Sequence, residues 1–308
     1  MFWSIMAILF VVPLVALYFV VIRSVDRYMP EPWWLLFLCL VWGSVGAVIP
    51  SVVGGLLGQE ALAAALNPQQ TEEGAVLVEN TAATFIAPLV EEPAKAIGLL
   101  AIYFFSRRRV HETHGPLSGM VYGGIIGLGF TLTEDIMYVI GAGNEAGGEG
   151  FFGLYFIRTV LLGFGHATFT ALTGLGFGMF VVMRSGWRWL MPALGLGGGM
   201  LIHFGRNLFA SFLMGEEGIG LVFILLLHLP FLWWSIAFFA ALVMYAGAFI
   251  VLHNLKYINK EATTEAGNKT KLYEPTSITI KVTHTDRHTG HERSLVKKLS
   301  YSDNKNSG

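Results

Sequence analysis

Long apolar stretches fill the first 253 positions of the chain, and short polar or glycine-rich segments separate them. A helix needs roughly 20 apolar residues to cross about 30 Å of hydrocarbon. The pattern therefore predicts an all-α fold, a polytopic transmembrane helical bundle of about seven spans. They lie at residues 2–22, 32–57, 81–105, 117–141, 153–183, 188–213 and 219–253. Pro230 interrupts the last stretch, so it forms either one span or two shorter pieces.

The pattern changes sharply near residue 255, where apolar stretches give way to a polar segment rich in Thr, Asn and Lys. Such a segment cannot bury enough apolar surface to offset its loss of conformational entropy. The sequence therefore predicts a transmembrane domain at residues 1–255 and a mostly disordered tail at residues 256–308. Within that tail only residues 277–282 have the composition of a short strand.

Charges in the loops indicate how the bundle is oriented. Basic residues follow the first span (Arg23), follow the third (107–109) and lie between the fifth and sixth (Arg184 and Arg188). The alternate loops carry Glu residues and no Lys or Arg. Because cytoplasmic loops carry the excess of Lys and Arg, we expect the N-terminus outside and the basic tail in the cytoplasm.

Composition supports the membrane class. Hydrophobic residues make up 54% of the chain and charged residues 13%, whereas soluble domains have about 25% charged residues. The basic residues are dispersed among loops and tail, so the sequence gives no indication of nucleic-acid binding. We expect a multi-pass protein of the cell (plasma) membrane. The single cysteine, Cys39, excludes a disulfide within the chain. The sequence does not indicate an oligomeric state.

Ionisable residues inside the predicted spans point to a functional site. A charged side chain at the bilayer centre costs about 2.5–3.5 kcal/mol on insertion scales, so such residues face one another or a wet cavity. Several of them fall at a similar depth, roughly 10–20 Å below the outer surface at 1.5 Å per residue. The candidate site residues are Glu91, Glu92, Lys95, Glu134, His166, His203 and Asn207. Arg158 and Arg206 are more simply read as neutralising acids or extending toward the interface.

Spacing brings some of these residues onto shared helix faces, because residues four apart are neighbours on a helix surface. Glu92 points about 100° away from Glu91, as 3.6 residues per turn requires. Four pairs have the four-residue spacing: Glu91 with Lys95, Phe130 with Glu134, His166 with Thr170, and His203 with Asn207.

Carboxylates and imidazoles in a protected cavity can activate water for hydrolysis. Glu takes the proton, His positions the water, and the Asn amide donates to a developing oxyanion. Glu and His are also zinc ligands, and a catalytic zinc has three protein ligands and one water. Glu134, His166 and His203 are the candidate ligands. The residues leave open whether the water is bound to a metal.

Two other classes of function fit the same polar residues. Intramembrane Glu, Lys and His also build proton relays in transporters, although the chain lacks the repeated halves that many transporters have. A non-catalytic membrane scaffold that keeps the polar site for binding is the third interpretation. The sequence has no HExxH on a span, no rhomboid-like Gly-x-Ser-Gly and no paired intramembrane Asp motif.

Four segments resemble the motifs of the PrsW family of membrane proteases. Residues 91–95 resemble EExxK, residues 130–134 resemble FxxxE, His166 resembles the single-His motif, and residues 203–207 resemble HxxxN. Residues 26–32 resemble the juxtamembrane segment found after the first span of the family. The resemblance covers about residues 20–215, with the motifs in the family's order on separate spans.

This resemblance implies a relation to the superfamily that includes the CAAX prenyl endopeptidases and bacteriocin-processing proteins. It implies a peptidase that cleaves membrane-bound protein substrates, such as anti-sigma factors. Glu91 and Glu92 would supply the base, Glu134 and the two histidines would complete the site, and Asn207 would support the oxyanion. One departure is Asp135, where the family often has Asn.

Overall fold

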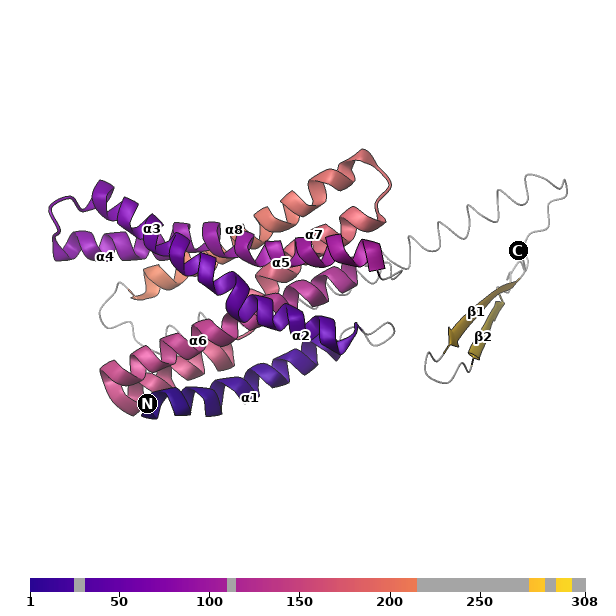
Figure 1. Ribbon diagram of the computed structural model, residues 1–308, viewed down its shortest axis with the longest axis horizontal. Coiled ribbons are helices and arrows are strands. Elements are labelled where there is room, and N and C mark those ends of the chain that lie inside the picture. Colours follow the sequence, from indigo (N-terminus) through magenta and orange to yellow (C-terminus); the bar gives the residue numbers. More distant parts are fainter. Residues whose placement is uncertain (25–30, 110–114, 215–276, 286–291, 301–308) are drawn as a thin grey trace, which may run out of the picture. The chain divides into compact units, whose positions relative to one another are not determined.

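The computed structural model describes residues 1–24, 31–109, 115–214, 277–285 and 292–300. The chain forms two compact units, Met1–Leu252 and His253–Gly308, and each is described by itself. The described part of the first unit is helical, as the pattern predicts (Figure 1). The predicted span at residues 219–253 lies outside the described residues.

The N-terminal half consists of α1 and two longer helical runs. Short π-helical turns, η1 and η2, join the α-helices within each run, and π-helical turns often occur at functional sites. A turn after Leu66 separates the runs, and the Thr71 hydroxyl caps the second by accepting from the amide of Gly74 at 3.0 Å. The bounds are α1 Phe2–Ser24, α2 Trp33–Val41, η1 Trp42–Ala47, α3 Val48–Leu66, α4 Glu72–Thr81, η2 Ala82–Ile86 and α5 Ala87–Arg109.

The next helix, α6 (Pro116–Tyr155), extends across the polar segment expected to separate two spans. Its backbone leaves the helical region at Ala146 and Gly147. Gly147 has φ of 63°, a conformation that glycine adopts at little cost. The acidic residues Glu145 and Glu149 therefore flank a sharp break between two helical pieces, rather than lying in an open loop.

The predicted span at residues 153–183 is divided in the structure. The π-helical turn η3 (Phe156–Leu161) ends the first piece, and three residues separate it from α7 (Gly165–Val182). A partner from the first helix accounts for this break. The Tyr18 hydroxyl lies 3.1 Å from the carbonyl oxygens of both Thr159 and Val160. It can donate to these carbonyls, which the end of a helix leaves without intrahelical partners.

A 3₁₀ turn, η4 (Gly186–Leu190), leads into α8 (Met191–Met214). Among the described residues, three helical runs are long and apolar enough to cross a membrane: Phe2–Ser24, Trp33–Leu66 and Pro116–Val182. The chain thus has the helices of a membrane protein, while the count of seven spans and the orientation stay predictions.

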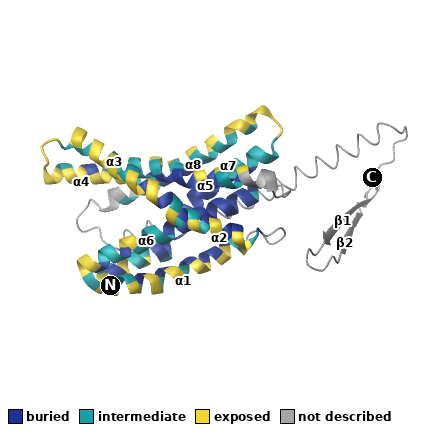
Figure 2. Ribbon diagram, viewed as in Figure 1, coloured by how far each residue is buried: buried dark blue, intermediate teal, exposed yellow. Residues whose placement is uncertain are grey.

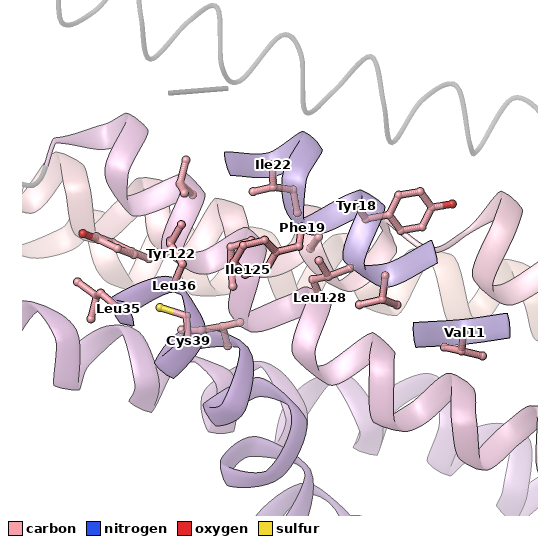
Figure 3. Packing of buried hydrophobic residues seen from close by; sticks show 14 of the residues in the cluster. Val11, Tyr18, Phe19, Ile22, Leu35, Leu36, Cys39, Tyr122, Ile125 and Leu128 are labelled. Atoms are coloured by element: carbon pink, nitrogen blue, oxygen red, sulfur yellow. The ribbon is translucent and has the colours of Figure 1, made fainter. Parts of the chain in front are cut away.

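Buried side chains of α1, α2 and α6 form the main apolar core (Figure 3). Tyr18 and Ile22 of α1, Leu36 and Cys39 of α2, and Ile125 of α6 belong to this cluster. The outer faces of α1 and α3 instead expose large apolar side chains (Figure 2). An apolar exterior is what a lipid-facing helix requires, because lipid tails are as apolar as Leu.

The second unit contains an antiparallel pair of strands, β1 (Ser277–Thr285) and β2 (Glu292–Ser300). Their register runs from Ser277 opposite Ser300 to Thr285 opposite Glu292. The short strand expected at residues 277–282 thus lies within a longer β1 that has a partner. The all-α expectation holds for the described part of the first unit and not for the tail.

Candidate active site

Two carboxylates and one ammonium on α5 form the centre of the site. Lys95 Nζ lies 3.2 Å from Glu91 Oε2 and 2.8 Å from Glu92 Oε1. The sequence predicted only the pairing with Glu91. Lys95 reaches both because its long, flexible stem spans the i,i+3 and i,i+4 positions of the same helix. Glu92 and Lys95 are 0% exposed, so one buried ammonium is shared between two carboxylates.

His166 stands at the start of α7 and links α5 to α6. Its Nδ1 lies 2.9 Å from Lys95 Nζ, and its Nε2 lies 2.7 Å from Glu134 Oε2. A lysine ammonium has no acceptor, so Nδ1 is the acceptor in that contact. The proton of the neutral imidazole then resides on Nε2, which donates to Glu134. The hydrogen-bond pattern thus assigns one tautomer to His166.

His203 lies on α8, and its ring has the opposite orientation to that of His166, with Nδ1 toward a carboxylate. Its Nδ1 lies 3.0 Å from Glu92 Oε1, and its Nε2 lies 4.0 Å from Glu91 Oε2. An ionised carboxylate only accepts, so Nδ1 donates to Glu92 and the lone pair resides on Nε2. The ring stacks on Phe169 with centroids 4.9 Å apart and also packs edge-on against His166. These contacts fix the plane of the ring.

One small space is therefore lined by three atoms: Glu91 Oε2, His166 Nδ1 and His203 Nε2. Glu91 Oε2 lies 3.9 Å from His166 Nδ1 and 4.0 Å from His203 Nε2. On the far side of each imidazole, a carboxylate accepts the other N–H: Glu134 behind His166 and Glu92 behind His203. A carboxylate behind a histidine is the usual way of orienting a metal-binding imidazole.

The chemistry of these donors fits a metal ion. Glu91, Glu92, His166 and His203 are all buried, and each offers one ligand atom within 4.8 Å of the others. Nitrogen and oxygen donors at this spacing suit zinc. Lys95 contacts three of these residues, so a metal ion would compete with its ammonium group for Glu91, Glu92 and His166.

Glu134 lies behind His166 rather than inside this group of four. It was expected as a ligand, but its Oε2 is bonded to His166 Nε2 and also lies 2.9 Å from Arg158 Nη2. The Arg158 Nε donates to Asp135 Oδ1 at 3.1 Å. Arg158 thus neutralises acids, as expected, and it bonds to both neighbouring carboxylates.

Two further site candidates have partners that spacing alone did not predict. The Thr170 hydroxyl donates to Glu92 Oε2 at 3.2 Å, rather than lying beside the His166 ring. The Asn207 amide nitrogen donates to the carbonyl oxygen of Ala83 at 2.9 Å and ties α8 to η2. Phe130, the aromatic residue of the FxxxE segment, lies under the ammonium of Lys95, 3.8 Å from its ring centroid. A cation over an aromatic face is attracted to it.

The comparisons with known proteins gave one family match. The model of the PrsW family intramembrane metalloprotease matches residues 31–235, which is more than half of the chain. The chain belongs to the PrsW family. The matched region contains every candidate site residue and the four motifs that carried the resemblance. The search of curated proteins gave no match, and neither did the search of solved structures.

Membership in the PrsW family makes this chain a membrane protease, a hydrolase of peptide bonds. It does not favour the transporter or the scaffold interpretation. The family description as a metalloprotease also agrees with the buried group of two Glu and two His residues as a place for a metal ion.

Proposed function

We propose that the chain hydrolyses peptide bonds of membrane-associated protein substrates in the cell (plasma) membrane, with Glu91 as the base that activates water. One observation carries this proposal: Glu91 Oε2 faces His166 Nδ1 at 3.9 Å and His203 Nε2 at 4.0 Å. Regulatory proteins of the anti-sigma type are the substrate class that the family resemblance suggests.

Glu91 is better suited than Glu92 to act as the base. Glu92 accepts from Lys95 and His203 on Oε1 and from Thr170 on Oε2, so both of its oxygens are occupied. Glu91 keeps 12% of its side chain exposed, whereas Glu92 exposes none. Among the described residues, the hydrogen bond to Glu91 comes from Lys95. Glu92 therefore acts as a positioning group for Lys95 and His203.

The proton path follows from these contacts. A water beside Glu91 donates one hydrogen to Glu91 Oε2 and the other to the lone pair of His203 Nε2, while His166 Nδ1 accepts from Lys95. Its oxygen attacks the scissile carbonyl as Glu91 takes the proton, and Glu91 later gives that proton to the leaving amine. Asn207 is the candidate donor to the oxyanion.

A metal ion would be held by His166, His203 and a neighbouring carboxylate of α5. When bound, a divalent ion supplies Lewis-acid polarisation and lowers the pKa of water. Zinc is the ion that the donor set suits best.

The test compares Glu91→Gln with Glu60→Gln, the same chemical change at an exposed position of α3. Both variants are reconstituted in liposomes with a panel of quenched fluorogenic single-span peptides. We expect kcat to fall at least 100-fold for Glu91→Gln, since general-base catalysis contributes about 10²–10⁴-fold. Glu60→Gln should stay within twofold of the parent. Cleavage by Glu91→Gln at the parent rate would refute the assignment of the base.

Metal content is measured in the same preparations, with cleavage recorded before and after chelation. About one zinc per chain that is lost together with activity supports the metal-bound form. Activity that resists the chelator in metal-free protein supports a water held by Glu91 and His203 alone.

A further inference from the structure

Arg158 lies outside all four motif segments, yet its guanidinium contacts two acidic residues next to the site. On η3, its Nη2 lies 2.9 Å from Glu134 Oε2 and its Nε lies 3.1 Å from Asp135 Oδ1. The guanidinium carbon also lies 3.9 Å from the centroid of the Tyr138 ring. All of these partners belong to α6, on the other side of the break at Gly147.

The Glu134 oxygen that Arg158 contacts is the same oxygen that His166 contacts. Glu134 Oε2 accepts from Arg158 Nη2 at 2.9 Å and from His166 Nε2 at 2.7 Å. The side chains of all three residues are at most 17% exposed. The direction of the Glu134 carboxylate therefore depends on Arg158, and the hydrogen bond that His166 Nε2 donates depends on that carboxylate.

We propose that Arg158 is a positioning residue for the histidine of the active site. It holds the Glu134 carboxylate where it accepts from His166 Nε2, so that the ring keeps Nδ1 against Lys95 Nζ and 3.9 Å from Glu91 Oε2. The inference rests on the proposed function, since it assigns Nδ1 to the space where water is activated. It assigns no contact between Arg158 and the substrate.

The two-pronged contact explains why this residue is an arginine. Its planar guanidinium presents donors in a fixed fork and bonds Glu134 and Asp135 at once, whereas the lysine ammonium is a point charge. Glu134 and Asp135 are adjacent in the sequence, and two like charges at this distance repel one another. Without the fork, the carboxylate of Glu134 is free to turn away from His166.

The first measurement is the nitrogen NMR spectrum of histidine-labelled protein, in which protonated and unprotonated ring nitrogens have distinct shifts. The variant His166→Gln identifies the signals of His166. We expect Nε2 to be protonated in both proteins, because Lys95 still donates to Nδ1, and the Nε2 signal to shift in Arg158→Gln because its hydrogen bond to Glu134 is lost. An unchanged His166 spectrum in Arg158→Gln would overturn the proposal. This measurement needs no turnover, so its failure is distinct from a failure of the proposed peptidase function.

The second measurement is a double-mutant cycle on kcat. If Arg158 acts through Glu134, then adding Arg158→Gln to Glu134→Gln causes no further loss, because coupled residues are not additive. We expect each single variant to lower kcat about 100-fold with KM within threefold, and the double variant to equal them. If the kcat losses of the two single variants multiply in the double variant, Arg158 does not act through Glu134 and the proposal is refuted. Arg184→Gln, at an exposed position after α7, is the charge-matched control and should keep parent activity.

Arg158→Lys keeps the test decisive if Arg158→Gln does not fold. It retains the charge but cannot bond both carboxylates in the same way. We expect it to melt within a few degrees of the parent while kcat falls about tenfold and the His166 signals shift partway. Parent kcat together with a parent spectrum in Arg158→Lys would show that charge alone is needed, and would overturn the positioning role.

Discussion

A glycine stripe on α6 offers the sharpest test of how the fold positions His166. Gly119, Gly123 and Gly127 are four residues apart and face backbone carbonyls of α7. A Cβ added at Gly127 would lie 2.1 Å from the carbonyl oxygen of His166 and 2.7 Å from the amide nitrogen of Ala167. Neither atom can rotate away, because both belong to the backbone. Gly127→Ala must therefore push α6 and α7 apart at His166.

The size of the effect follows from these distances. Ordinary contact with a Cβ begins at 3.4 Å, so the 2.1 Å approach requires a local separation of about 1.3 Å. Overpacking of this kind costs about 1–3 kcal/mol, and the better helix propensity of Ala offsets about 1 kcal/mol of it. Misplacement of a catalytic group by about 1 Å can cost 10²-fold in rate. We expect kcat to fall about 100-fold while the free energy of unfolding falls by only about 0–2 kcal/mol.

Gly141→Ala is the matched control, since it makes the same change in the same helix where no atom lies within 4 Å of the added Cβ. Cleavage of the fluorogenic peptides in liposomes gives kcat, and denaturant titration in detergent gives the unfolding free energy. Gly141→Ala should match the parent in both. Full activity of Gly127→Ala would refute the argument that this close backbone contact sets the position of His166.

Three further changes test single contacts of the site. Lys95→Met removes the ammonium that competes with a metal ion for Glu91 and His166. Titration calorimetry should therefore give a zinc Kd at least tenfold lower than that of the parent. Zinc should also raise the melting temperature of the variant, which loses stability with the ammonium. Thr170→Val removes the hydroxyl that donates to Glu92, so the free energy of unfolding should fall by about 1–3 kcal/mol in denaturant titration. Trp42→Phe removes the indole N–H that donates to the Ala94 carbonyl at 3.2 Å, and the same titration should give a loss of about 1 kcal/mol. An unchanged zinc Kd, or unfolding energies equal to the parent, would contradict these assignments.

The sequence predicted which helices contribute to the site because helical spacing is a local property. Glu91 and Lys95 had to share a face, and the motif order brought His166 and His203 to separate helices. The structure adds contacts that depend on several helices at once. Whether Glu134 lies inside the group of four or behind His166 depends on the distance between α6 and α7, which no single segment determines.

The helix boundaries in the structure differ from the predicted ones for a similar reason. Apolar residues dominate residues 153–183 despite Arg158 and His166, so hydropathy alone predicts one span there. The break before α7 depends on the hydroxyl of Tyr18, a residue 141 positions away from Thr159. Long-range partners of this kind leave no local pattern in the sequence. The strand pair in the tail likewise depends on the pairing of β1 with β2.

The glycine stripe also limits how a polypeptide substrate can reach the catalytic water. Along this seam α6 and α7 touch backbone to backbone, at Gly119 with Gly174 and at Gly127 with His166. An extended chain passing between them would have to separate the helices that hold the histidine in place. A substrate that enters laterally from the bilayer therefore has to pass between other helices, because the contact between α6 and α7 is closed on this side of the site.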